Sequence, residues 1–220
     1  MARKAKVNEK KFQRKSPLHR REENTTEKRL RYLIVCEGEK TEPAYFNALK
    51  NDLPKGIVTI EVFGAGDHTT NLVEAAKQKR KQAVKNMQPF DRVWVVLDRD
   101  SFPADRFNAA VEMAKQEEMG CAYSNEAFEL WYLLHFDFID TGISRSQYGE
   151  MLTAYLGFEY QKTATNIYKT LQEKGNQKKA IKFAEKLEKL HADTSPADAN
   201  PCTKVHLLVK ELDAFRPKPQ

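Results

Sequence analysis

Between residues 30 and 136, short apolar runs alternate with segments of helical periodicity. The apolar runs have the length and composition of buried strands, and they occupy residues 30–37, 56–64, 91–100 and 121–125. The helical patterns between and after them cover residues 41–53, 69–87, 104–120 and 126–136. Strands that alternate with helices predict crossover connections, so we expect an α/β fold with a mainly parallel sheet flanked by helices.

The pattern changes after residue 142. Four further segments have helical periodicity and none has the pattern of a strand; they are residues 144–156, 163–175, 176–192 and 200–215. We therefore expect an α/β domain over residues 29–142 and a C-terminal helical extension, residues 143–220, packed on it. Within the first domain, Thr41 and Asn125 are expected to cap the helices that follow them, because short polar side chains satisfy the free N–H groups of a first turn.

The positive charge of the chain is concentrated in its first 28 residues. The net charge is +6; ten of the 37 Lys and Arg residues and four of the 31 Asp and Glu residues lie in this arm, so the other 192 residues are neutral overall. The arm has few large apolar residues, and we expect it to be largely disordered. Such an arm either binds phosphates or keeps the chain in solution, and the sequence leaves both open.

Several classes of protein do not fit the sequence. No apolar run approaches the roughly 20 residues of a membrane helix, and the basic N-terminus lacks the apolar stretch of a signal peptide. Cys36, Cys121 and Cys202 are widely separated and have no CxxC spacing, so neither a disulfide framework nor a structural zinc site is expected. We expect a soluble, cytoplasmic protein with no membrane partner.

Carboxylates follow two of the predicted strands. Glu37 follows the first strand, with Glu39 and Glu42 close by, while Asp98 and Asp100 end the third. The C-terminal ends of parallel strands lie along one edge of the sheet, so these side chains are expected to meet there. An extended Asp-x-Asp directs both carboxylates to one side, and hard oxygen ligands favour Mg²⁺ or Mn²⁺. Acids at strand ends also occur as helix caps or surface groups, and this alternative stays open.

Two sets of motifs carry a resemblance to known proteins. The segments VCEGEKTEPAYF and VVLDRD resemble the Toprim arrangement, the α/β module of primases, topoisomerases and overcoming-lysogenization-defect nucleases. The blocks CEGEKTEPAYFNAL, DRD, SNEAFELWYLLHF and NPCTKVHLLV, in this order, are similar to the RloB-like family, whose members are found beside bacterial restriction systems and among phage-abortive proteins. The resemblance covers roughly residues 30–213 and leaves out only the basic arm.

The resemblance implies a Toprim-like sheet and metal-dependent phosphodiester cleavage in antiphage defence. Glu37 would be the Toprim glutamate, acting as general acid or base or as a metal ligand, and Asp98 and Asp100 would be the metal-binding pair. Glu42 and Glu129 are candidate ligands of a second ion. Nucleic acid, DNA or RNA, is the implied partner, and a companion ATPase is a further implication. The sequence leaves the oligomeric state open, a homo-oligomer included.

Several basic residues and two histidines are further candidates for binding or packing roles. Lys40 is a candidate contact for a substrate phosphate, whereas Arg99 is expected to point away from Asp98 and to screen the carboxylates. Lys77, Lys81 and Lys85 recur at i, i+4 spacing, which allows a nucleic-acid track on one helix face, although a solvated outer face fits the spacing as well. His135 and His206 follow apolar stretches and are expected to pack in the core.

The sequence also allows two functions other than a nuclease. The segment LDRDS resembles the Asp-x-Asp of haloacid-dehalogenase phosphatases, in which the first aspartate attacks phosphorus, but that motif belongs near the first strand and normally has Thr or Val where Phe102 stands here. The other alternative is a non-catalytic module that binds nucleic acid or a partner with a Toprim-like fold. Such a module would tolerate the loss of Glu37, Asp98 and Asp100.

Overall fold

The structure is a computed structural model that describes residues 29–56, 58–66, 69–100 and 102–216. Its strands are β1 (Leu30–Cys36), β2 (Val58–Gly64), β3 (Arg92–Asp98), β4 (Gly120–Asn125) and β5 (Cys202–Thr203). Its helices are α1 (Thr41–Asp52), α2 (Thr70–Lys85), α3 (Ala104–Gln116), α4 (Glu129–Leu133), α5 (Arg145–Leu156), α6 (Ile167–Lys174), α7 (Gln177–Leu190) and α8 (Val205–Asp213). The basic arm of residues 1–28 lies outside the described residues.

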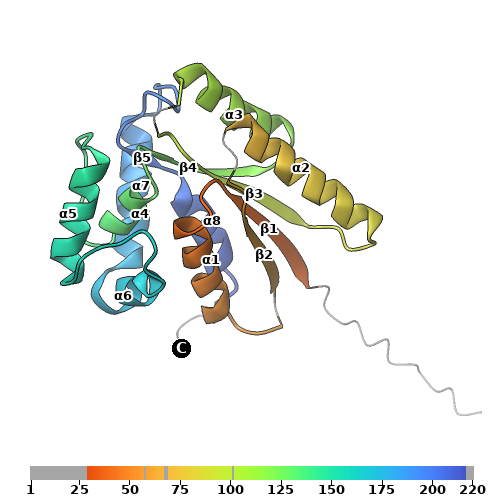
Figure 1. The fold of residues 1–220 in the computed structure, drawn as a ribbon, viewed down its shortest axis with the longest axis horizontal. Coiled ribbons are helices and arrows are strands. Elements are labelled where there is room, and N and C mark those ends of the chain that lie inside the picture. The colour runs from red at the N-terminus through yellow and green to blue at the C-terminus, as the bar shows by residue number, and fades with distance from the viewer. Residues whose placement is uncertain (1–28, 57, 67–68, 101, 217–220) are drawn as a thin grey trace, which may run out of the picture.

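One mainly parallel sheet organises the described residues, as Figure 1 shows. Its strand order is β2-β1-β3-β4-β5, with three parallel pairs and a final antiparallel pair. In the register of β1 and β3, Cys36 lies opposite Val96, so both strands end at the same edge of the sheet. This confirms the expected α/β fold and its parallel strands.

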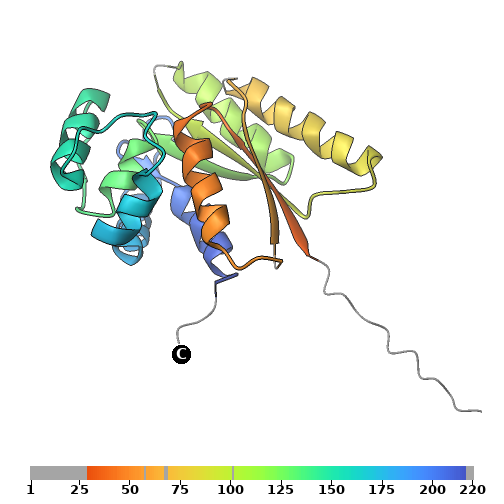
Figure 2. The same cartoon turned by 60° about the horizontal axis from the view of Figure 1, so that its bottom comes forward.

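Helices cover both faces of the sheet and enclose two hydrophobic cores. Alternate residues of β1 point to opposite faces: Ile34 packs with α1 and α4–α8, whereas Val35 packs with α2 and α3. Figure 2 shows the two layers of helices on either side of the strands. The larger core therefore joins one face of the sheet, from β2 to β4, to α1 and to the helices of the C-terminal half. In it, the buried Trp131 indole N–H donates a hydrogen bond to Tyr45 (2.9 Å).

Two expected helix caps are wrong. The segment predicted as a helix over residues 126–136 contains only the five-residue α4, and Asn125 is the last residue of β4 rather than a cap. The Asn125 side chain instead donates to the backbone oxygen of Ala197 (2.9 Å), which ties β4 to the segment before β5. Thr41 does not cap α1 either, because its hydroxyl donates to the backbone oxygen of Lys162 (3.2 Å).

The C-terminal half contains a strand that the sequence pattern did not predict. Cys202 and Thr203 form β5, which pairs with Asn125 and Ser124 of β4. The Ser124 and Thr203 hydroxyls also hydrogen-bond to each other (2.9 Å). Two residues give too short an apolar run for a strand pattern, so only the tertiary structure reveals the pairing.

All three cysteines are free thiols, and each is buried or partly buried. None of the helices in the described part of the chain combines the length and apolar character that crossing a bilayer requires.

Candidate functional site

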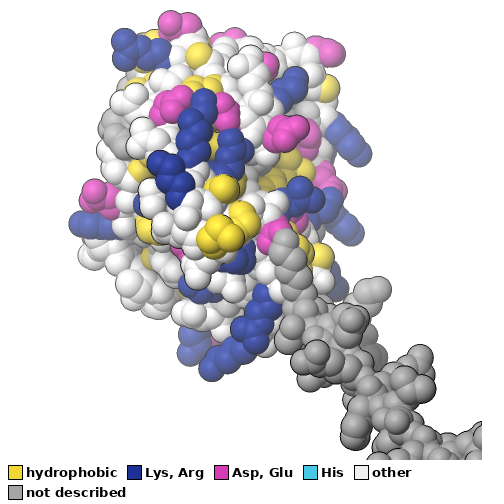
Figure 3. All heavy atoms as spheres, turned by 90° about the vertical axis from the view of Figure 1, so that its right-hand side faces the viewer, with side chains coloured by type: hydrophobic (Ala, Val, Ile, Leu, Met, Phe, Trp, Pro, Cys, Tyr) yellow, Lys and Arg dark blue, Asp and Glu magenta, His cyan; other side chains and the backbone are white. Residues whose placement is uncertain are grey.

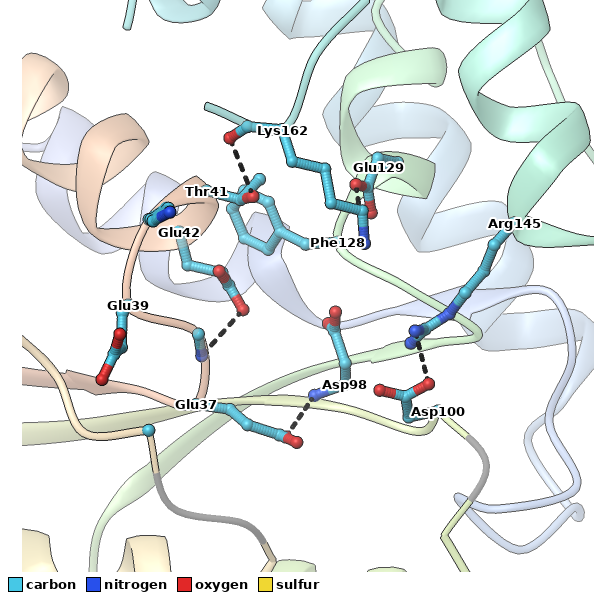
Figure 4. Close-up of a pocket in the computed structure, with 13 residues that line it drawn as sticks. Glu37, Glu39, Thr41, Glu42, Asp98, Asp100, Phe128, Glu129, Arg145 and Lys162 are labelled. Atoms are coloured by element: carbon cyan, nitrogen blue, oxygen red, sulfur yellow. Dashed lines mark hydrogen bonds and ion pairs between the residues drawn. The ribbon is translucent and has the colours of Figure 1, made fainter. Parts of the chain in front are cut away.

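A pocket of about 370 Å³ opens at the C-terminal edge of the sheet, where β1 and β3 end. Six acidic and three basic side chains of the described residues line it, as Figure 4 shows: Glu37, Glu39, Glu42, Asp98, Asp100, Glu129, Lys40, Arg145 and Lys162. All five acids predicted as catalytic are among them, and so is Lys40. Asp98 and Asp100 lie 61 and 63 positions after Glu37 in the sequence, and the parallel strands bring them to the same edge of the sheet, as predicted.

The carboxylate of Glu37 is held against the end of the neighbouring strand. Its Oε2 accepts a hydrogen bond from the backbone N–H of Asp98 (3.1 Å), and its own N–H donates to Val96 O (3.0 Å). Glu37 is buried, with 6% of its surface exposed. The strand pairing thus sets both the depth and the direction of this side chain.

The pKa values of Asp98 and Glu42 are both raised in the pocket. Burial raises the pKa of Asp98 well above its usual range, and the charges of Glu42, Glu129 and Glu37 raise it further. Burial likewise raises the pKa of Glu42, against the lowering effect of the Gly38 N–H that donates to it (3.3 Å). Asp98 Oδ1 is shielded from solvent and has no hydrogen-bond partner among the described residues.

Gly38 lets Glu42 fold back over the end of β1. A Cβ at Gly38 would lie 2.4 Å from Glu42 Oε2, closer than non-bonded atoms approach. A larger residue would therefore displace the carboxylate from the pocket or move the loop. The close approach of the Glu42 carboxylate thus gives a steric reason for a glycine at position 38.

Asp100 reaches the pocket by a different route from the one expected. β3 ends at Asp98, and Asp100 has φ of 45°, so the extended geometry that was expected to align the two aspartates does not continue. The Asp100 carboxylate forms an ion pair with Arg145, the first residue of α5. Arg99 points away from Asp98, as predicted, and its Nε donates to Ala197 O (3.3 Å).

Glu129 is a buried acid with two partners from one later segment. Tyr160 OH donates to its Oε1 (3.0 Å), and Lys162 Nζ lies 3.6 Å from the same atom. Only 4% of Glu129 is exposed. The loop after α5 therefore closes one side of the pocket, and it explains why an acid stands in the apolar segment around α4.

The pocket has the donor chemistry of a site for a hard divalent cation. Its carboxylates offer only oxygen, the ligand type that Mg²⁺ and Mn²⁺ prefer, and Asp98 Oδ1 lacks a compensating partner. The residues present fit such an ion, since Mg²⁺ is commonly held by one or two carboxylates together with water and phosphate oxygens. Within the described ranges, however, no three His, Cys, Asp or Glu side chains are already gathered as a ligand set.

The predicted lysine track lies elsewhere. Lys77, Lys81 and Lys85 belong to α2, on the other face of the sheet, and none of them lines the pocket. Lys77 is paired with Glu117 (2.5 Å), and Figure 3 shows basic and acidic side chains interspersed on the side of the molecule to which α2 extends. The structure therefore does not bring this track to the candidate site, and its binding of nucleic acid stays a prediction.

The histidines are buried away from the pocket, as expected. His135 is 1% exposed and its Nδ1 hydrogen-bonds to Trp131 O (2.9 Å). His206 is fully buried and its Nε2 lies 3.2 Å from a carboxylate oxygen of Glu188.

Sequence reasoning missed three residues that face the acids of the pocket: Arg145, Tyr160 and Lys162. All three come after residue 143, in the part interpreted as an extension packed on the α/β domain. No local motif marks them, because their partners are more than 30 positions away in sequence. Only the packing of the segment after α4 against the strand ends reveals them.

The fold and the pocket define the chain as an α/β protein with a carboxylate-lined site at the C-terminal edge of its parallel strands. A family model described as RloB-like protein matches residues 32–212, and the chain belongs to this family. The resemblance expected from the four sequence blocks is thereby confirmed at the level of the family. Searches of curated proteins and of solved structures found no match.

Proposed function

We propose that the chain is a divalent-metal-dependent nuclease of the Toprim type. The observation that carries this proposal is the convergence of Glu37 and Asp98 from neighbouring strands, beside Glu42 and Glu129, with one buried Asp98 oxygen left without a partner. Burial, and secondarily the neighbouring charges, raise the pKa values of Asp98 and Glu42, and a cation bound between such carboxylates would stabilise their charged form. Phosphodiester cleavage is a reaction that such an ion serves.

The residues of the pocket would have different roles in binding the ion. Asp98 and Glu37 would hold the ion, with Glu42 and Glu129 as further oxygen donors and Asp100 at the edge of the pocket. A bound Mg²⁺ or Mn²⁺ would neutralise charge on the phosphodiester and orient water. The backbone N–H of Asp98 fixes the direction of Glu37, which is thereby oriented as general base or ligand.

The biological setting is part of the proposal. We infer a cytoplasmic nuclease in bacterial antiphage defence, acting on DNA or RNA under the control of a companion ATPase. Support comes from membership of the RloB-like family and from the resemblance of its motifs to those of phage-abortive proteins. A nuclease that attacks the host as well as the phage would need such a restraint.

Two observations favour a second candidate, a non-catalytic module that binds nucleic acid or a partner. Arg145 forms an ion pair with Asp100, and the described residues hold no assembled set of three ligands. In this case the carboxylates would be compensated by cationic side chains of the same chain instead of by an ion. The phosphatase alternative has no comparable support.

The deciding experiment is incubation of the purified chain with total nucleic acid and Mn²⁺ or Mg²⁺, alone and with the product of the neighbouring gene. We expect metal-dependent cleavage that is lost in Glu37→Ala and in Asp98→Asn. The matched control is Glu173→Ala, since Glu173 is an exposed acid of α6 outside the pocket. Cleavage that survives both pocket variants would refute the assignment, and binding without cleavage in any condition would favour the second candidate. Release of phosphate from p-nitrophenyl phosphate would indicate a phosphatase.

A further inference from the structure

The pocket has two walls of opposite charge that come from different parts of the chain. The predicted catalytic carboxylates all lie before residue 130, on the strand ends, α1 and α4. Arg145 and Lys162 lie on α5 and in the loop that follows it, and their side chains face Asp100 and Glu129 across the opening (Figure 4). The segment after residue 143 thus supplies cations to an acidic site.

Helix stability does not explain the position of Arg145. It is the first residue of α5, where the positive end of the helix dipole disfavours a cation. The turn is already satisfied without it, because Ser144 and Gln147 form a capping box. The guanidinium is also incompletely bonded: Nη1 pairs with Asp100, Nη2 lies 3.5 Å from the backbone oxygen of Glu126, and the buried Nε has no partner among the described residues.

Lys162 has a fixed backbone and a loosely held side chain. Thr41 at the start of α1 hydrogen-bonds to the Lys162 backbone oxygen, which anchors the loop at the rim. The Lys162 side chain is 60% exposed, and its 3.6 Å separation from Glu129 exceeds a normal hydrogen bond. Tyr160 also donates to Glu129 Oε1 (3.0 Å), so Glu129 keeps a hydrogen-bond partner when the exposed ammonium group turns toward another anion.

We infer that Arg145 and Lys162 bind backbone phosphates of the nucleic acid and position the strand over the carboxylates. Guanidinium offers planar, paired donors that match a phosphate, and Lys offers a mobile point charge. An acidic pocket repels a polyanion, so cations on the opposite wall are needed to retain the strand. The inference deepens the proposed nuclease function and rests on it for the identity of the ligand.

The test measures binding instead of turnover. Short fluorescein-labelled oligonucleotides of DNA and RNA, single-stranded and duplex, are titrated by anisotropy in Ca²⁺ buffer over a series of KCl concentrations. We expect Arg145→Met and Lys162→Met each to weaken binding about tenfold, the size of one charge-assisted hydrogen bond. Each should also reduce the slope of log K against log salt by about one. Lys169→Met, at an exposed position on α6 outside the pocket, is the control and should change neither.

Arg145→Lys separates phosphate binding from a structural role. It keeps the charge, so the salt slope should stay near the wild-type value while the paired hydrogen bonds are weakened. If the role of Arg145 were purely structural, its substitution would instead lower the melting temperature and leave the salt slope of the folded protein unchanged. Lys162→Met controls for folding, because its side chain is exposed.

Two results would overturn the inference. One is affinity and salt slope within twofold of wild type in both Met variants; the other is a wild-type chain that binds none of the oligonucleotides. Failure of the nuclease proposal gives a different pattern, in which binding depends on Arg145 and Lys162 but no metal produces cleavage. In that case the chain is a nucleic-acid-binding module and the assignment of the two cations stands.

Discussion

The pH dependence of stability tests the core role of His135. Its Nδ1–H donates to Trp131 O, its ring packs edge-to-face on the Trp131 indole at 4.9 Å, and its backbone oxygen accepts from Asn176 N (2.8 Å). The Nε2 atom is buried without a partner among the described residues. Burial therefore lowers the pKa of His135 to about 4, and its backbone hydrogen bonds offset only part of that effect.

The sign and size of the effect follow from the two pKa values. In the unfolded chain the imidazole takes up a proton near its ordinary pKa of 6.5, whereas in the folded chain it stays neutral down to about pH 4. Between these values the unfolded state binds more protons, so the free energy of unfolding falls as the pH falls. A difference of roughly 2.5 pKa units corresponds to about 3 kcal/mol, all of it retained at neutral pH.

The assay compares wild type with His135→Asn by urea unfolding at several pH values between about 7.5 and 4.5. Asn keeps a donor near the position of Nδ1 and does not titrate, so its packing cost is the same at each pH. The titration of the carboxylates is common to both proteins and cancels in their difference. We expect the wild type to lose about 2 to 3 kcal/mol more than the variant on acidification. Parallel curves for the two proteins would refute the assignment of a neutral, buried His135.

The remaining predictions concern the metal and two glycines. Mg²⁺ at a hundred times its Kd should raise the free energy of unfolding by about 3 kcal/mol, and EDTA should reverse it; an equal rise in Asp98→Asn would place the ion elsewhere. Gly120→Ala should lower stability by about 1–3 kcal/mol, because its Cβ would lie 2.3 Å from the Trp94 ring. Gly149 lies inside α5, and an added Cβ there would meet no atom of another segment within 4 Å, so Gly149→Ala should raise stability by about 0.5–1 kcal/mol. Thermal and urea unfolding measure both; equal effects of the two alanines would contradict the steric argument.

The sequence could predict the sheet and the convergence of the acids because both depend on local signals. β1 and β3 are apolar runs bounded by polar residues, and they end within two residues of the predicted boundaries. Parallel pairing then places Glu37 beside Asp98 without further information. This argument needs the order of elements along the chain but not the packing of side chains.

The other half of the site depends on packing between distant segments. Arg145 faces Asp100 only because α5 packs against α4 with its first residue next to the end of β3, and no periodicity in the sequence specifies that packing. Asn125 looked like a helix cap because a polar residue precedes an apolar stretch, but its side chain binds the backbone at Ala197. Local propensity was overridden there by a tertiary contact.

The pairing of β5 with β4 affects when the sheet and the pocket can assemble during translation. Glu37 and Asp98 leave the ribosome early, but the strand at Cys202–Thr203 and the helix that follows it are among the last described elements to be made. The large core needs Val205 and Leu208 as well as Ile34. A nascent chain therefore lacks part of the large core until residues 202–213 have been made, which delays assembly of the pocket until that point of synthesis.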